Sequence, residues 1–572
     1  MNKKLVVNNK VIPLQTLKPL CAALLLAVSP FCAQAAGPEV PNAGSLLREI
    51  QPLKPAVPSS TGTGLRIEPS AATLPASAPF RVKTLRISGN RQFDRATLHA
   101  LVADAQGTDM TLPQLGELTE RITAYYRDHG YPLARAIIPA QTIRDGEVLI
   151  EVVEAHYGEI GLDNRSRVND SLLTATLAPL KSGQAISQAE LDQQLLLLSD
   201  IPGIAINATL KPGQTVGTSD LLVNTLAGPT VSGNLALDGY GNRYTGRERL
   251  GGTLNLNNPL GHGDVLSLSA LSSGSGLNYG RLGYESLLNG QGTRLGGSYS
   301  ALRYKLAEEF EDLDAHGSAQ VGSVWAKHPL LRSRNLNLSG QIQYDRLQLR
   351  DRVDLSAIRT DRHLDNWTAS LAGDARDTLG SGGISLWNLG VTVGRVEFDD
   401  SAAQAADAAS ANSRGGFSKW NASLVRLQRL SLNNSLYLSV SGQWADGNLD
   451  SSQKMSAGGP YSVRAYDIGV LSGDSGYMGS AELRHDLGAA WAGQWQALAF
   501  IDSAHVTLNQ NRWSGLSGPN SATLSGAGVG LNWSGPSQWS AKASIATPIG
   551  ATPELLSDAD SVRGWLGVSW GF

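Results

Sequence analysis

The chain is poor in cysteine, with two in 572 residues. Cys21 and Cys32 both lie in an N-terminal stretch that is typical of a secretory signal. Once that signal is removed, the mature chain has no cysteine, which excludes disulfides, thiol catalysis and cysteine-ligated metals. The nine histidines are scattered without paired ligand spacing, so the sequence predicts no metal site and no cofactor.

Residues 1–35 predict a cleaved signal peptide. The apolar run Leu20–Val28 follows four lysines, which are Lys3, Lys4, Lys10 and Lys18. The triplet Ala33-Gln34-Ala35 then matches a small-residue cleavage site. Removal of four lysines and no acids changes the formal net charge from −3 to −7. This acidic balance indicates no nucleic-acid partner.

Long hydrophobic runs are missing after the signal. No stretch of about 18 apolar residues occurs there, so no transmembrane helix is expected. The chain nevertheless contains 63 glycines, 12 tryptophans and 15 tyrosines. An exported protein with aromatic-rich, alternating segments and no spanning helix is typical of a membrane β-barrel.

Residues 230–572 show this alternation throughout. Leu336, Leu338, Ile342 and Tyr344 alternate with polar residues, as apolar-out and polar-in strands would. A soluble β-sandwich would alternate too, but it would need more large residues on its buried side than the Ser, Gln and Asn found here. We count about sixteen such runs, and an even number suits a single-chain antiparallel barrel. The long connections are expected at 305–317, 351–361, 399–415 and 447–476.

The segment before the barrel divides into four parts. Residues 42–51 predict a short helix with Leu46, Leu47 and Ile50 on one face, and residues 52–79 a Pro/Ser/Thr/Ala-rich linker. A disordered N-terminus is the alternative. Residues 80–155 and 156–228 each predict a βααββ unit, and the weak echo between them suggests a repeat. Two unrelated α+β domains remain the alternative.

One charge pair links a loop to a strand. Val463-Arg464-Ala465-Tyr466 lies in a Gly/Ser-rich segment between two strand-like runs, and Phe500-Ile501-Asp502 lies in a strand-like run. Arg464 and Asp502 could form a bidentate pair that pins the loop to the wall. In a polar lumen such a pair would be worth only about 0–1 kcal/mol, so its expected role is positional.

These pieces resemble the VRGY/F loop and the F-x-D-x-G strand of the Omp85 superfamily, and most closely the TpsB transporters of two-partner secretion (FhaC and ShlB types). Glu482-Leu483-Arg484 matches the Glu-Leu-Arg of the following strand, and Phe500 begins the second motif. Ala465 and Ala504 replace the family glycines. If either glycine needs a positive φ, the local geometry here would differ.

The resemblance implies two periplasmic α+β repeats of the POTRA type, followed by a 16-stranded antiparallel transmembrane barrel in the outer membrane of a Gram-negative bacterium. It implies that helix 42–51 plugs the pore and that loop 447–476 folds inward. It also implies that the POTRA units bind the N-terminal secretion domain of a large TpsA-like exoprotein, without nucleic acid or enzymatic activity. The terminal Trp570 and Phe572 resemble the signal read by the barrel-assembly machinery.

Three alternatives remain open from the sequence. A barrel-assembly factor of the same superfamily is the nearest one. A porin or an outer-membrane enzyme would leave the two α+β repeats unexplained. Gly473-Asp474-Ser475-Gly476 is weak evidence for a serine protease. Asp502 and His505 are three apart on a strand and so should point to opposite faces.

Overall fold

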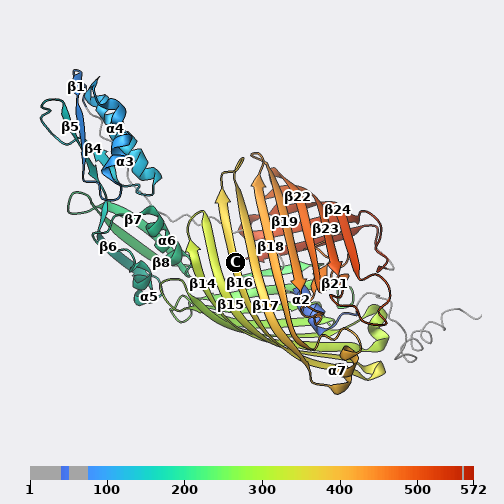
Figure 1. Cartoon of the computed structure of the whole chain (residues 1–572). Helices are drawn as coiled ribbons and strands as arrows, with labels where there is room; N and C mark the ends of the chain where they lie inside the picture. Colours follow the sequence, from blue (N-terminus) through green and yellow to red (C-terminus); the bar gives the residue numbers. More distant parts are fainter. Residues whose placement is uncertain (1–39, 51–74, 557–559) are drawn as a thin grey trace, which may run out of the picture.

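The computed structural model describes residues 40–50, 75–556 and 560–572. The predicted signal peptide and most of the predicted linker lie outside these ranges. Within the described ranges, no helix is long and apolar enough to cross a membrane. The molecule consists of an arm of two α+β units beside a large barrel (Figure 1).

The first unit of the arm follows the order expected from the sequence. Its elements are β1 (Phe80–Val82), β2 (Thr84–Ser88), α3 (Arg95–Ala100), β3 (Thr108–Met110), α4 (Leu112–Asp128), β4 (Arg135–Ile137) and β5 (Glu147–Val153). Helix α4 begins with a capping box between Thr111 and Gln114. Its apolar face buries Leu115, Leu118 and Ile122 against the sheet β2-β5-β4.

The second unit repeats this topology. Its elements are β6 (His156–Arg165), α5 (Asp170–Leu177), α6 (Gln188–Ser199), β7 (Ile204–Pro212) and β8 (Thr218–Ala227). In the three-stranded sheet of each unit the last strand is central: β5 pairs in parallel with β2 and antiparallel with β4, and β8 pairs in parallel with β6 and antiparallel with β7. Gly107 and Gly183, which the repeat aligns, both have φ near +80°.

Sixteen antiparallel strands close into a barrel (Figure 1). In chain order they are β9 (Val231–Asp238), β10 (Arg249–Asn257), β11 (Val265–Ser272), β12 (Leu277–Leu287), β13 (Arg294–Lys305), β14 (Ala315–Arg332), β15 (Leu336–Val353), β16 (Ile358–Asp377), β17 (Gly383–Phe398), β18 (Gly415–Arg429), β19 (Asn434–Ala445), β22 (Ser475–Ala490), β23 (Gly493–Thr507), β24 (Ser521–Ser534), β25 (Trp539–Pro548) and β26 (Arg563–Gly571). The first and last strands, β9 and β26, pair to complete the ring.

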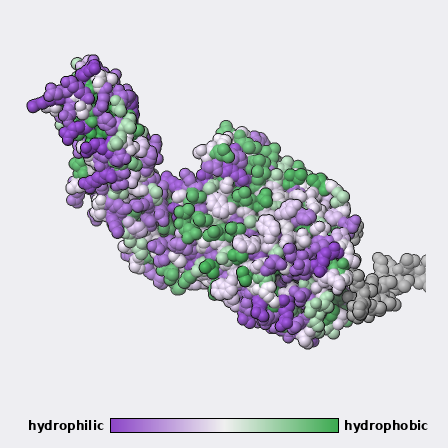
Figure 2. Space-filling view, in the orientation of Figure 1, coloured by the Kyte–Doolittle hydropathy of each residue, from purple (hydrophilic) through white to green (hydrophobic). Residues whose placement is uncertain are grey.

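The alternation of apolar and polar residues inverts partway along the longest strands. On β15 the outward residues are apolar up to Tyr344, beyond which Arg346 and Gln348 are exposed. Over the same stretch the inward Leu347 and Leu349 are buried. On the neighbouring strand the change falls between Trp367 and Asp365. The wall therefore leaves the apolar layer at this level, and Figure 2 shows hydrophilic residues gathered at that end of the barrel.

This inversion corrects two expectations. The connection expected at 351–361 is only Asp354–Ala357, because β15 and β16 continue as paired strands to Val353 and from Ile358. Their charged residues face water above the apolar layer. The interior is not polar throughout either: Leu302, Leu349, Leu364 and Phe417 form a core inside the barrel.

A short helix, α2 (Ala43–Ile50), lies inside the barrel (Figure 1). Its side chains Ala43, Leu46 and Leu47 are buried in the interior core. The helix thus falls within the range 42–51 expected from the sequence, and its apolar face meets the inverted part of the wall.

One buried carboxylate organises the first α+β unit. Glu154 Oε1 accepts hydrogen bonds from the backbone N–H of Arg91 (2.7 Å), the backbone N–H of Gln92 (2.8 Å) and the Tyr126 hydroxyl (2.8 Å). Burial and the Glu154 carboxylate raise the pKa of Tyr126 well above its ordinary value. Glu154 therefore joins the β2–α3 turn to α4.

Replacing Glu154 with Ala should destabilise this unit. The change leaves two backbone N–H groups and a buried hydroxyl unpaired, which should cost about 3 kcal/mol of local stability. Hydrogen exchange of the β5 amides in the full chain measures it. The matched control Glu151→Ala removes an exposed carboxylate from β5 and should change exchange little. Equal effects of the two variants would contradict the assignment.

Candidate functional site inside the barrel

The loop between β19 and β22 turns back into the barrel; we call residues 446–474 the inward loop. It contains a small hairpin of β20 (Met455–Ala457) and β21 (Leu471–Gly473). At its tip Val463, Ala465 and Tyr466 are 0%, 1% and 4% exposed. The loop tip is therefore packed against the barrel wall. The inward loop spans nearly the same residues as the connection 447–476, which was expected to fold inward.

Arg464 of the inward loop and Asp502 of β23 form a bidentate pair. Arg464 Nε lies 2.8 Å from Asp502 Oδ2, and Nη2 lies 2.7 Å from Oδ1. The Arg464 backbone N–H donates to the same carboxylate at 3.2 Å. Both residues are buried, so the expectation of a weak, solvated pair is wrong. Loss of one partner of a buried pair costs roughly 3–5 kcal/mol.

A second carboxylate completes the charge balance around Arg464. Glu482 Oε1 lies 2.9 Å from Arg464 Nη1, while its other oxygen pairs with Arg484. The guanidinium carbon of Arg464 lies 3.3 Å from the centre of the Phe500 ring, and that of Arg484 lies 4.3 Å from the Tyr437 ring. Each of the two arginines thus lies against an aromatic ring, and both are paired with carboxylates.

Small residues let the loop tip approach the wall. A Cβ on Gly526 of β24 would lie only 2.4 Å from the Ala465 Cβ, so the alanine rests on bare backbone. Trp565 Nε1 of β26 donates to the Arg464 carbonyl at 2.7 Å. Neither Ala465 nor Ala504 has a positive φ, so alanine in place of the family glycine imposes no backbone strain here.

The base of the inward loop is fixed by another buried pair. Lys454 Nζ lies 2.9 Å from Asp474 Oδ1, and both side chains are buried. Asp474 also accepts the backbone N–H groups of Leu449 (3.1 Å) and Gln510 (2.8 Å). The Gly473–Gly476 stretch therefore positions the base of the loop, and its aspartate is occupied by structural contacts.

Helix α2 is anchored by its N-terminus. Asn42 Oδ1 caps the helix by accepting the N–H groups of Gly44 and Ser45. The Ala43 N–H donates to Asp351 Oδ1 of β15 at 2.8 Å, where a negative charge is favoured.

The carboxylate that receives the helix belongs to a buried network. Arg362 of β16 lies 2.7 Å from Asp351 and 2.5 Å from Asp450 of the inward loop. Arg362 also donates to Ser451, whose hydroxyl is 2.7 Å from Asn42 Oδ1. Helix, wall and loop are therefore joined by one set of hydrogen bonds.

The helix also lies directly against the inward loop. A Cβ on Gly44 would lie 2.5 Å from Ser451 Oγ and 2.7 Å from the Ser452 nitrogen. At the next turn Arg48 donates to the Lys454 carbonyl and to the Ser472 hydroxyl. Only glycine permits this contact at position 44.

The last turn of the helix places Glu49 in a confined space. Its carboxylate accepts from Asn242 Nδ2 at 3.2 and 3.3 Å, with Arg48 and Arg249 nearby. A Cβ on Gly469 would lie 2.4 Å from Glu49 Oε1. Burial raises the pKa of Glu49 to about 7, against the lowering effects of Asn242 and the two arginines.

The end of the chain closes the barrel. Phe572 and Gly233 exchange backbone hydrogen bonds of 3.0 and 2.9 Å, and the ring of Trp570 stacks on Trp539. Trp570 and Phe572 thus lie where the last strand of the barrel meets the neighbouring strands that close it.

The residues considered for catalysis or metal binding are not brought together. Asp502 is buried at the loop tip, whereas His505 bonds Thr523 and stacks on Tyr477, as expected for opposite faces. In the described part of the chain, one group could hold a metal ion: Asp314, His316 and Asp354, at the adjacent ends of β14 and β15. Lys305 already pairs with Asp314 at 2.7 Å.

Several members of the site were missed in the sequence. Tyr437, Ser480 and Trp565 contact the arginine cluster from three different strands. No role was predicted from the sequence for Arg362, Asp351 or Asp450. Strand parity would place Arg362 and Asp351 inside the barrel if the predicted strands were continued beyond the apolar layer to include these residues.

Comparison with known proteins agrees with this architecture. The profile of the haemolysin secretion/activation protein ShlB/FhaC/HecB family matches residues 217–533, and that of the ShlB-type POTRA domain matches residues 80–155. The heme/hemopexin transporter protein HuxB of Haemophilus influenzae (strain 86-028NP) is 27% identical over 92% of this chain and 94% of its own length. The outer membrane transporter CdiB of Dickeya dadantii is 23% identical over 86% and 87%. The structure of CdiB from Escherichia coli superposes with a TM-score of 0.68 at 22% identity, covering 90% of this chain and 94% of that one, which shows a common fold.

Gly44→Val should release helix α2 from the barrel. Any side chain at this position would overlap Ser451 and the Ser452 backbone. We expect higher single-channel conductance in planar bilayers. Gly322→Val is the matched control, because a Cβ there meets nothing within 4 Å. Unchanged conductance in Gly44→Val would show that the helix does not close the lumen.

The hold on helix α2 should weaken as the pH rises. Glu49 has a pKa near 7 when the helix is docked and an ordinary value of 4.5 when it is free. The raised pKa favours the docked helix below pH 4.5, and this contribution is lost between about pH 4.5 and 7. Conductance should therefore be higher at pH 8 than at pH 5. Glu49→Gln should remove this dependence, and a pH response that persists in this variant would assign it to another group.

Proposed function

The chain belongs to the family of haemolysin secretion/activation proteins ShlB, FhaC and HecB, and from this premise we propose that it exports one large partner protein through its own barrel. It is a two-partner secretion transporter of the outer membrane, with its POTRA region in the periplasm. The observation that supports the proposal is a lumen occupied by helix α2 and the inward loop, both held by polar contacts.

Helix α2 is the first part that must leave. It is only eight residues long, contributes three buried side chains (Ala43, Leu46 and Leu47) to the interior core, and is attached to the chain through the segment 51–74. We infer that its departure frees Asp351 and Ser451, which loosens the loop limb that carries Asp450. The Arg464 tip then shifts relative to β23, and the passage widens.

The periplasmic arm supplies recognition. Strand β6 lies at the edge of its sheet. His156 and Tyr157 already pair with residues 183–185, so the part of the strand after Tyr157 offers the edge for an added strand. Addition of an extended segment to a sheet edge provides backbone hydrogen bonds with little dependence on sequence. We infer that the N-terminal secretion domain of the partner is bound there while still unfolded.

The partner is a large secreted exoprotein. The relatives include transporters of heme/hemopexin and of haemolysin, and we propose a TpsA-like substrate of this kind. The sequence has no nucleotide-binding motif, so folding of the substrate outside would draw the chain outward. The terminal strand with Trp570 and Phe572 is proposed as the segment that the barrel-assembly machinery recognises.

The proposed function is tested by comparing the proteomes of the culture medium and of the outer membrane between cells with and without the gene. Loss of one very large protein from the culture medium, with the outer-membrane profile unchanged, is the expected result. General depletion of outer-membrane barrels would instead assign the chain to barrel assembly. No change in either proteome would favour a porin.

Arg464→Asp should abolish secretion while the barrel still assembles. The variant places a third carboxylate beside Asp502 and Glu482, so the loop tip cannot dock in its buried position. Secreted partner in the medium is the readout, and heat-modifiable mobility on a gel reports assembly. The control Arg512→Asp makes the same change on an exposed loop. Normal secretion by Arg464→Asp would remove the arginine from the mechanism.

A further inference from the structure

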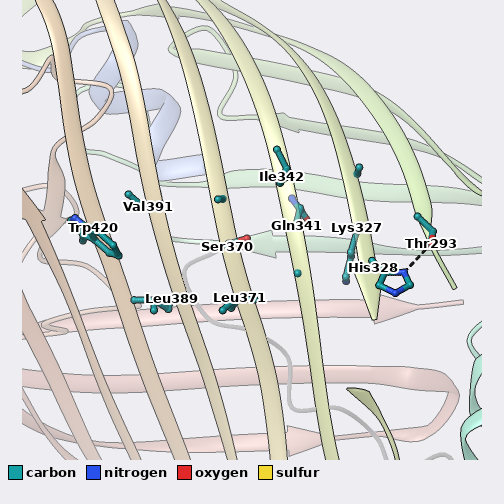
Figure 3. Close-up of a pocket in the computed structure, with 13 residues that line it drawn as sticks. Thr293, Lys327, His328, Gln341, Ile342, Ser370, Leu371, Leu389, Val391 and Trp420 are labelled. Carbon is teal, nitrogen blue, oxygen red and sulfur yellow. Dashed lines mark hydrogen bonds between the residues drawn. The ribbon is translucent and has the colours of Figure 1, made fainter. Parts of the chain in front are cut away.

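A groove crosses the outer wall of the barrel over strands β14 to β18 (Figure 3). Its volume is about 510 Å³. Small residues form its floor, namely Ala326, Gly340 and Ala369. Large apolar side chains border it, namely Ile342, Leu371, Leu389, Val391 and Trp420. Four of these five are between 42% and 58% exposed, so the groove opens outward to the membrane.

The floor and border residues follow the strand register. Ala326, Ile342, Ala369, Val391 and Trp420 are directly paired partners in one row across five strands. Four inter-strand spacings make this row about 19 Å long. Because the strands of such barrels are tilted by about 45°, the row runs obliquely through the apolar layer. A single hydrocarbon chain has this narrow and elongated shape.

One end of the groove is polar. Thr293 Oγ1 and His328 Nδ1 lie 2.9 Å apart there (Figure 3). Among the described residues, His328 Nε2 has no hydrogen-bond partner. A histidine on the outer face of a barrel is costly unless a polar group meets it. This end therefore suits a headgroup, and the opposite end, at Trp420, suits hydrocarbon.

The polar end lies on the periplasmic side. Thr293 directly precedes the periplasmic start of β13. A Cβ on the adjacent Gly292 would lie 2.8 Å from both Leu197 of α6 and Pro329, so the second α+β unit abuts the wall at this point. A lipid with its headgroup here would belong to the periplasmic leaflet.

We propose that the groove binds one acyl chain of a glycerophospholipid from the periplasmic leaflet, with the headgroup phosphate at His328 and Thr293. The small floor residues admit the chain, and Trp420 borders its far end. A lipopolysaccharide chain would enter from the opposite leaflet, where the groove offers an indole and no polar pair. The site does not depend on the export mechanism.

The test counts bound lipids by native mass spectrometry of the full chain after incubation with phosphatidylglycerol in detergent. Wild type should retain one phosphatidylglycerol. Gly340→Leu fills the floor, because a Cβ there meets Leu330 and Leu371 only at ordinary contact distances of 3.6 and 3.7 Å. Its occupancy should fall about tenfold. Gly280→Leu is the matched control on the lipid face of β12, with nothing within 4 Å, and should retain the lipid.

Two further arms identify the lipid and its orientation. His328→Ala combined with Thr293→Val should lower phosphatidylglycerol occupancy and leave binding of uncharged diacylglycerol unchanged. Ala369→Phe is a second floor variant, and heat-modifiable mobility confirms that each variant has assembled. Preferential retention of lipopolysaccharide, equal occupancy in Gly340→Leu and wild type, or no retained lipid in wild type would each overturn the proposal.

Discussion

The buried arginine at the tip of the inward loop is the interaction on which the interior depends. A guanidinium removed from water must be paired or its burial is prohibitive, and Arg464 is met by Asp502, Glu482 and the face of Phe500. The carboxylates come from two adjacent strands, so the position of the loop is specified by the wall itself. Without this arrangement the tip of the loop would have no charged partner on the wall.

The second constraint is that helix and loop share one support. Arg362 lies between the carboxylate that receives the helix N-terminus and the carboxylate that holds the loop limb. Removing the helix takes a donor from Asp351 and an acceptor from Ser451, while the Arg464 cluster keeps all its partners. The interior can therefore open in stages, with the helix contacts breaking before the tip contacts.

Much of this arrangement could be predicted from the sequence. The period of alternation predicts sixteen strands, and capping and turn residues predict the arm. The Arg464–Asp502 pair follows from a loop arginine and a strand aspartate. The burial of that pair could not be predicted, because it depends on Trp565 and Gly526, which lie more than sixty residues from Arg464 in sequence. The interior core was also missed, since the inward positions of β15 become apolar, at Leu347 and Leu349, only beyond Tyr344.

The inversion of the wall has a consequence for where the cargo emerges. Strand β15 continues for nine residues beyond Tyr344, which raises the rim about 20 Å above the apolar layer. The rim is raised only on the side of the long strands, since β9 to β12 have only 8 to 11 residues, and the barrel opening there stands clear of the lipid surface. A polypeptide leaving it would begin to fold in water, away from hydrocarbon that could adsorb its apolar segments. The raised side of the rim therefore keeps a departing chain apart from the membrane hydrocarbon.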